Sequence, residues 1–246
     1  MSAALIVVVV AGTVAGGFVS GMSGFAFGMV AYSIWAWFLA PALMAPMVVF
    51  GSLLAQLLSL GAVRRSLHWR LLAPFLAGGM AGVPLGAALL PRVDLDLFRA
   101  AIGAVMIVYS LFMLVGRRVR LDVEIGRWAD AAVGLVGGVM AGLAGLSGVA
   151  PTIWCTLRGW EKDVQRSVFQ TFNLAMHVAT LSAYAIGGHI TAELTPMFAV
   201  MVPAVVVPTW AGVRLYARLS DGAFRRLVLV LLAVSGSVLL GAVVTR

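Results

Sequence analysis

Residues 16–28 read GGFVSGMSGFAFG, and residues 137–149 read GGVMAGLAGLSGV. Both stretches contain the pattern GGxxxGxxG, and the second copy begins 121 residues after the first, close to half of the 246-residue chain. The repeated pattern predicts two related halves, residues 1–120 and residues 121–246, within one compact domain. The matching glycines are Gly16, Gly17, Gly21 and Gly24 in the first copy and Gly137, Gly138, Gly142 and Gly145 in the second.

The composition around these stretches is that of a membrane protein. Hydrophobic residues make up 62% of the chain and charged residues 11%, with a mean hydropathy of +1.06. Soluble domains are about 45–50% apolar and about 25% charged. A bilayer, unlike water, accepts an outer surface as apolar as the core, and only helices or closed barrels satisfy their backbone groups there. The sequence therefore predicts an all-α polytopic membrane protein.

We expect ten apolar segments, of which two are short. A helix needs about 20 apolar residues to cross the hydrocarbon core, and the second and seventh segments fall below that length. Short or broken segments must be enclosed by other helices or face a water-filled cavity, because lipid cannot pair their backbone groups. The segments are residues 3–20, 25–40, 42–63, 71–90, 97–115, 130–147, 149–157, 164–187, 195–213 and 224–244.

The charged residues lie in or beside the gaps between these segments. The net charge is +8, but no basic stripe with interleaved aromatic residues exists, so we expect lipid and not nucleic acid around the chain. If all ten segments cross, the four most basic gaps share one side, which the positive-inside rule makes cytoplasmic, and both termini are periplasmic. If the short segments instead re-enter the membrane, the number of crossings changes and this assignment of sides does not follow. The basic residues of these gaps are Arg64, Arg65, Arg70, Arg117, Arg118, Arg120, Arg127, Arg158, Lys162, Arg166, Arg214, Arg218, Arg225 and Arg226.

The glycine repeat has two interpretations. Five segments per half is an odd number, so the second half would be inverted relative to the first, and inverted repeats with broken helices are typical of secondary transporters. Glycine tolerates the unwound backbone of such a break, and the helix N-termini that a break frees suit an anion. The alternative is close helix packing, for which small residues at this spacing are common.

Polar residues within apolar segments are candidates for a substrate site, because they are costly in a membrane. Gln170, Asn173 and His177, together with Thr180, follow a spacing that places them on one helix face, and Thr171 lies beside them. An offset of 121 residues matches Ser52 to Asn173 and Gln56 to His177 and predicts polar groups at matching depth in both halves. Hydrogen bonding between helices is the alternative role for this face.

The glycine-rich stretches supply further candidates. Ser23 with Gly24, and Ser147 with Gly148, lie in the two expected breaks, where each hydroxyl could donate to an oxyanion or cap a helix. His177 could also carry a proton with the anion, because its unperturbed pKa is near neutrality. Trp35, Trp37 and Trp154 are candidates to line a pathway.

The chain resembles the sulfite exporter TauE/SafE family, also called the 4-toluene sulfonate uptake permease family. The resemblance rests on the two glycine-rich stretches and on GLAGLSGVAPTIWCTLRGWEKDVQRSVFQTFNLAMHVATLSAYAIGGHIT, residues 142–191. It implies an exporter of small sulfur-containing or organic anions, such as sulfite or sulfonates, in the bacterial inner membrane. The family's second motif often carries a run of glycines where this chain has residues 147–151. Pro151 there lacks a backbone N–H, so a break can persist by other means.

Other function classes fit less well. The P-loop pattern, GxxxxGK[ST], contains a lysine after a glycine. The single lysine of the sequence, Lys162, lies in EKDVQ, so the chain is not itself an ATPase. His68, His177 and His189 are scattered without a nearby acid, and Cys155 is the single cysteine, so we expect no catalytic residues, no metal site and no cofactor. An anion channel, which lacks a saturable exchange site, is the alternative to a carrier. A homodimer is compatible with either.

Overall fold

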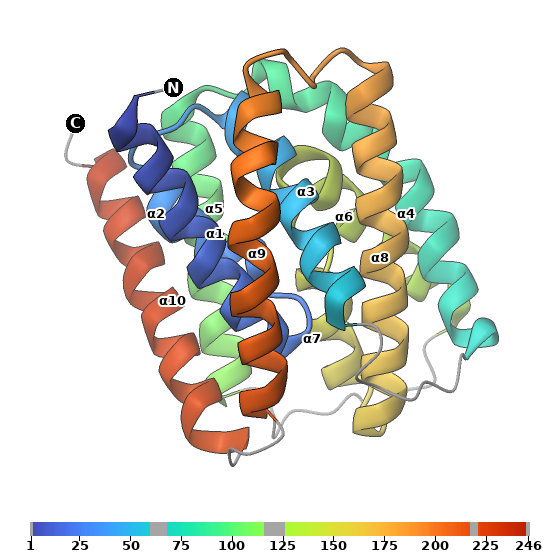
Figure 1. Cartoon of the computed structure of the whole chain (residues 1–246). Helices are drawn as coiled ribbons and strands as arrows, with labels where there is room; N and C mark the ends of the chain where they lie inside the picture. The colour runs from blue at the N-terminus through green and yellow to red at the C-terminus, as the bar shows by residue number, and fades with distance from the viewer. Residues whose placement is uncertain (1, 60–67, 116–125, 217–220, 245–246) are drawn as a thin grey trace.

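The chain folds into a bundle of helices in a computed structural model that describes residues 2–59, 68–115, 126–216 and 221–244 (Figure 1). Within these ranges no strand occurs, and the predicted all-α fold is confirmed. The helices are α1 (Ala3–Ser23), α2 (Phe27–Trp35), α3 (Pro41–Ser59), α4 (Trp69–Leu89), α5 (Leu95–Val115), α6 (Arg127–Ala144), α7 (Val149–Leu157), α8 (Lys162–Ile186), α9 (Leu194–Tyr216) and α10 (Asp221–Val244), and a short 3-10 helix, Leu90–Arg92, follows α4.

Several of the helices are long and apolar enough to cross a membrane. Five described spans meet this criterion: Ala3–Ser23, Pro41–Ser59, Trp69–Arg92, Leu95–Leu114 and Leu194–Leu215. Of the basic residues used for orientation, Arg64, Arg65, Arg117, Arg118, Arg120 and Arg218 lie outside the described residues, as do the side chains of Lys162 and Arg225.

Two glycines of the repeated pattern end long helices. Gly24 follows α1 with φ of 87°, and Gly145 follows α6 with φ of 67°, so both occupy the left-handed region that glycine adopts without strain. Their N–H groups donate to Ser20 O and Ala141 O, each at 2.7 Å. The chain then turns and begins a second helix within five residues in both cases. The two predicted helix breaks are therefore present at matching glycines.

Each short helix folds back along the long helix before it. In the first pair, Phe27 lies beside Gly16, and Trp35 lies beside Gly12. In the second pair, Ser147 lies beside Gly137, and Trp154 is hydrogen-bonded to Asp130. Helices α2 and α7 have 9 residues each, which span about 13 Å, less than half of a hydrocarbon core of about 30 Å. Each short helix forms a hairpin with the long helix before it, and neither short helix is long enough to cross the core alone.

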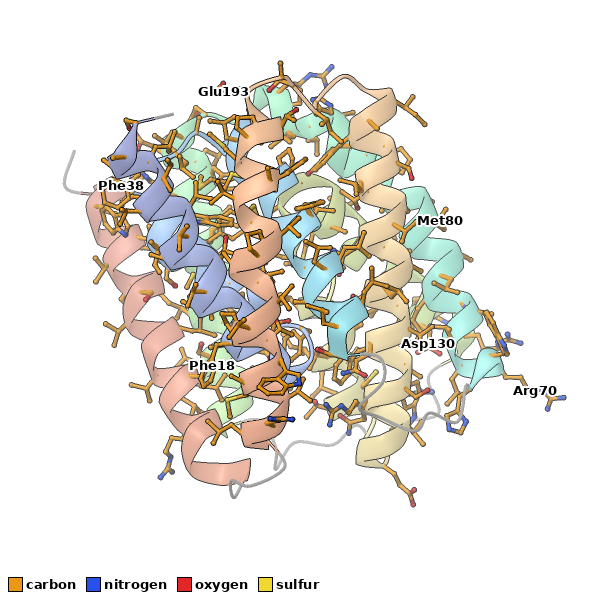
Figure 2. All side chains as sticks on the ribbon, viewed as in Figure 1. Phe18, Phe38, Arg70, Met80, Asp130 and Glu193 are labelled. Atoms are coloured by element: carbon orange, nitrogen blue, oxygen red, sulfur yellow. The ribbon has the colours of Figure 1, made fainter. Side chains whose placement is uncertain are left out.

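The hairpins enter the molecule from opposite ends. Helix α1 begins where both termini lie, whereas α6 begins at the other end, where the Arg127 side chain reaches Arg70 O at 3.5 Å (Figure 1). Figure 2 shows Arg70 and Asp130 at this second end, and Phe38 and Glu193 at the end with the termini. Because each hairpin returns to the end from which it started, the described basic gaps still share one end. We call this the basic end and the other the terminal end.

Three close helix pairs join the N-terminal and C-terminal halves of the chain: α4 with α6, α1 with α9, and α5 with α10. Glycines allow backbone contact in each pair. Gly103 of α5 and Gly236 of α10 lie against each other's carbonyl oxygens, and Gly21 of α1 lies against the Thr209 backbone of α9. The α4–α6 pair has three glycines on each helix at four-residue spacing: Gly78, Gly82, Gly86, Gly134, Gly138 and Gly142.

Candidate functional site

The first break is capped by a serine. Ser23 Oγ donates to Val19 O at 2.8 Å and accepts from the backbone N–H of Ala26 at 3.2 Å and of Phe25 at 3.4 Å. The two N–H groups belong to the turn just before α2, where a helix start leaves N–H groups without an intrahelical acceptor. The Ser23 hydroxyl thus bonds to the backbone on both sides of the break, and its role in oxyanion binding stays a prediction.

The second break is joined to α8 through Asn173. Ser147 Oγ donates to Asn173 Oδ1 at 3.0 Å. Gly148 lies so close that a Cβ there would be 2.7 Å from Asn173 Nδ2. That nitrogen is buried and has no hydrogen-bond partner among the described residues. Three candidates, Ser147, Gly148 and Asn173, are therefore brought together around an unused donor.

The two breaks contact each other. Phe25 lies against Gly148, with its Cδ2 3.2 Å from the position of a Cβ there, and Leu146 lies against Gly28 at 2.8 Å from the equivalent position. Gly24 lies against the amide of Gln170, which is 2% exposed. The breaks of the two hairpins and the middle of α8 therefore form one buried cluster. We define the break cluster as Ser23, Gly24, Ser147, Gly148, Gln170 and Asn173.

The cluster is polar on the α8 side and apolar on the α3 side. Gly145, which matches Gly24 in the repeated pattern, lies against Val48 and Val49 of α3. The position matched by the 121-residue offset to Val49 is Gln170. One glycine therefore faces an amide, and its counterpart faces a valine. The amides that line the breaks come from the second half of the chain.

The polar face of α8 continues from the cluster toward the terminal end. His177 is 3% exposed and Thr180 is fully buried. In the described part of the chain, four atoms along this face lack a hydrogen-bond partner: Gln170 Oε1, Asn173 Nδ2, His177 Nδ1 and Thr180 Oγ1. Thr171 is only partly buried and lies off this face. Native proteins pair most buried polar atoms, so this row of unpaired groups is the strongest sign of a ligand path.

The two α3 candidates lie apart from this row. Ser52 and Gln56 are both 4% exposed, and neither amide atom of Gln56 has a partner within the described ranges. Helices α3 and α8 run in opposite directions (Figure 1). Gln56 lies near the C-terminal end of α3, and His177 lies in the C-terminal half of α8. The match in depth between the offset-matched groups of the two halves stays a prediction. Gln56 adds unpaired groups on α3 to those on α8.

Two tyrosines fix the end of α6. Tyr32 Oη donates to Ala144 O at 2.7 Å, and Tyr184 Oη donates to Gly142 O at 2.6 Å. These carbonyls belong to the last turn of α6, which lacks intrahelical donors. Sequence reasoning missed both residues. Tyr184 carried a usable signal, because it follows Thr180 by four residues on the same polar face, whereas Tyr32 carried none.

Two charged residues were read from the sequence only as parts of gaps. Arg99 is 7% exposed, and its Nε donates to Ala36 O at 2.8 Å, at the C-terminal end of α2. Asp130 is 3% exposed and accepts from Trp154 Nε1 at 2.7 Å. Each therefore holds one end of a short helix. Trp35 and Trp154, expected as pathway residues, bind the preceding long helix through their indole N–H groups.

The break cluster offers neutral hydrogen-bond groups. Asn173 Nδ2 is an unused donor, and the first N–H groups of α7 have no intrahelical acceptor by the geometry of a helix start. The positive end of the α7 dipole points the same way. No group of three or more His, Cys, Asp or Glu that could hold a metal ion occurs among the described residues. This chemistry suits a small oxyanion that binds through its oxygen atoms.

A protein-family model described as "Sulfite exporter TauE/SafE" matches residues 8–239. The matched range contains both glycine-rich stretches and every residue of the break cluster. No curated protein and no solved structure matches the chain.

Proposed function

The chain belongs to the sulfite exporter TauE/SafE family, and from this premise we propose that it is a secondary transporter that exports small sulfur-containing or organic anions. Sulfite and sulfonates are the proposed substrates. The membrane is the bacterial inner membrane. We propose no enzymatic role and no cofactor.

One observation carries the proposal: the two helix breaks meet at a buried cluster with an unused donor. Asn173 Nδ2 has no partner among the described residues, and Gly148, which directly precedes α7, packs against it. Secondary transporters commonly bind substrate where broken helices meet near the bilayer midplane. Neutral donors hold an anion without a permanent ion pair, so the anion can leave again.

We propose that transport proceeds by alternating access about the break cluster. The opposite entry of the two hairpins supports two inverted repeats, residues 1–120 and residues 121–246. The row of unpaired groups on α8 leads from the cluster toward the terminal end, and Gln56 lies on the basic side of the cluster. These groups would bind the anion in turn as it moves between the central site and either side of the membrane.

His177 is the proposed carrier of a co-transported proton. It is buried one helical turn beyond Asn173, and its Nδ1 is unpaired among the described residues. Replacing His177 with alanine should remove the pH dependence of transport while binding at the cluster remains. Transport with an unchanged pH dependence in His177→Ala would contradict this role.

The basic end is proposed to face the cytoplasm, with both termini periplasmic. The described basic gaps share one end, and Trp69 and Trp128 are exposed there by 59% and 76%, as expected of side chains at a membrane interface. Alkaline phosphatase fused to the C-terminus should be active, whereas a fusion after residue 120 should be inactive. The opposite pattern would reverse the orientation.

Counterflow in proteoliposomes tests the transporter directly. Vesicles are loaded with unlabelled sulfite, a sulfonate or a small carboxylate, and uptake of the labelled anion is followed. A carrier gives saturable uptake that a loaded substrate accelerates. Linear flux without acceleration would indicate the alternative, an anion channel, and no flux of any of these anions would overturn the proposed substrate class.

A further inference from the structure

Both hairpins are closed by the indole N–H of a tryptophan on the short helix. In the first hairpin, Trp35 Nε1 donates to Val8 O at 3.0 Å. In the second, Trp154 Nε1 donates to Asp130 Oδ1 at 2.7 Å. Each bond joins the far part of the short helix to an early turn of the long helix. Both hairpins therefore have an indole hydrogen bond between the short and the long helix, but the acceptor is a main-chain carbonyl in the first and a carboxylate in the second.

The first hairpin is closely packed around its bond. Trp35 and Phe27 are both fully buried. Trp35 approaches α1 at Gly12, where any Cβ would collide with the indole. The acceptor is a main-chain carbonyl. This hairpin therefore has extensive apolar contact to hold α2 in place even without the hydrogen bond.

The second hairpin is less completely packed. A groove of about 330 Å³ runs between α6 and α7. Because this groove reduces the apolar contact between the two helices, the hydrogen bond to Asp130 has a larger part in holding α7. The lining residues are Ala132, Val133, Val136, Ala150, Ile153 and Trp154.

The acceptor in this hairpin is a carboxylate that is 3% exposed. Hydrogen bonds to a carboxylate are shorter and stronger than those between neutral groups. Removing one partner of such a buried pair is costly, because it leaves the other unpaired away from water. The Asp130–Trp154 bond is therefore a local determinant of where α7 lies.

We propose that Asp130 is a positioning residue for transport, which acts through Trp154 to hold α7 against α6. Helix α7 starts at the break cluster, so its placement sets Ser147 and Gly148 relative to Asn173. The role in transport rests on the proposed function, whereas the hold on α7 does not.

The accessibility of one residue of the chain reports whether α7 is held in place. Cys155 is the single cysteine of the sequence and follows Trp154 on α7. It is fully buried, within an apolar cluster that includes Phe75 and Phe172. A thiol reagent reaches it only when α7 separates from the helices that cover it, which include α4 and α8, or when the protein unfolds. N-ethylmaleimide labelling of Cys155 therefore measures release of α7 without any measurement of transport.

The experiment compares labelling rates in purified, monodisperse protein, normalised to complete labelling after denaturation. Asp130→Ala and Trp154→Phe should each raise the rate by about 10- to 100-fold, because each removes a hydrogen bond to a charged group. The double variant should label no faster than the single variants, because both remove the same bond. Asp130→Asn, which keeps a neutral acceptor for the indole, should label much more slowly than Asp130→Ala. Trp35→Phe, the matched change in the first hairpin, should leave Cys155 protected.

Three results would overturn the proposal: Asp130→Asn labels as fast as Asp130→Ala, the two single effects multiply in the double variant, or Trp35→Phe exposes Cys155 as much as Trp154→Phe does. If the single variants do not fold, Asp130→Leu combined with Trp154→Phe leaves no polar partner alone. This double variant should fold, and its Cys155 should be labelled faster than in the wild type. A labelling rate equal to that of the wild type would contradict the role of the Asp130–Trp154 bond.

Counterflow in the same variants separates this proposal from the proposed function. Asp130→Ala should raise KM for the anion, and Asp130→Asn should restore it. If the labelling rates follow the prediction but the wild-type protein transports none of these anions, the role of the Asp130–Trp154 bond stands and the proposed transporter is rejected. If the wild-type protein transports the anion but Asp130→Ala and Trp154→Phe do not change the labelling rate, only the proposed role of the Asp130–Trp154 bond is rejected.

Discussion

Asn173 combines a used acceptor with an unused donor. Its Oδ1 accepts from Ser147, and its Nδ2 is buried without a partner among the described residues. A group in this state is costly unless a ligand completes it. At the scale of single residues, this amide is the most informative place to test what binds at the breaks.

Asn173→Ala should raise KM in counterflow by about 10- to 100-fold, the expected loss of one hydrogen bond to a charged ligand. Asn173→Asp should impair transport further, although it keeps an acceptor for Ser147, because a carboxylate repels an anion. Ser33→Ala is the matched control, because among the described residues this hydroxyl bonds within its own helix, to Met29 O. Better transport by Asn173→Asp than by Asn173→Ala would show that the site does not hold an anion.

Gly145→Ala should destabilise the protein by about 1–2 kcal/mol, the usual cost of placing an L-residue in the left-handed region. The backbone there has φ of 67°, and a Cβ would also press on Val48 at 2.8 Å. The measurement is the thermal unfolding midpoint in detergent. Gly241→Ala, where a Cβ meets nothing within 4 Å, should leave the midpoint unchanged or slightly raised. Equal midpoints in the two variants would contradict the strained position.

At the scale of helices, the sequence predicted where most elements lie. The expected segment 149–157 coincides with α7, and the expected segment 130–147 overlaps α6 but runs past Gly145, where the left-handed turn ends the helix. Hydropathy cannot detect that turn, because the residues after Gly145 are as apolar as those before it. The repeated glycines indicated the break, but only the fold shows that α7 turns back.

The bonds that hold the short helices were not predictable from local pattern. Tyr32 reaches Ala144 across 112 residues of sequence, and Arg99 reaches Ala36 across 63. Such contacts depend on which helices are neighbours, and hydrophobic periodicity does not report this. The polar face of α8 was predictable because its members follow one another within a single helix.

Gly82→Ala should separate α4 from α6. A Cβ at Gly82 would meet the backbone of Leu135 and Val139, which cannot rotate away as a side chain does. We expect a loss of about 1–3 kcal/mol, the usual cost of overpacking, read as a lower unfolding midpoint in detergent. Ala81→Val adds methyl groups on the exposed side of the same helix and should have little effect. A comparable loss in Ala81→Val would show that bulk anywhere on α4 is harmful.

At the scale of the whole molecule, the close helix pairs connect the N-terminal and C-terminal halves. The pairs α4–α6, α1–α9 and α5–α10 each take one helix from each side of the 116–125 segment. The halves therefore cannot rock as separate rigid bodies without breaking backbone contacts at Gly103 and Gly21. The moving parts of a transport cycle must be smaller than a half or built from helices of both.

Cutting the chain between residues 120 and 121 should test this arrangement. Each half expressed alone should be degraded or aggregate, because its glycine-lined faces lack their partners. The two halves expressed together should assemble into a monodisperse protein with a cooperative unfolding transition. A stable, monodisperse half on its own would contradict the interlocked arrangement.

The neutral character of the break cluster has an electrical consequence. Ser147, Gln170 and Asn173 are uncharged, so in the proposed site the charge would be that of the bound anion alone. A monovalent anion that crosses without a companion moves one elementary charge, which is worth about 2.3 kcal/mol per 100 mV of membrane voltage. Export from a cell with a negative interior would then draw on the voltage itself. If His177 delivers a proton in the same step, no net current flows.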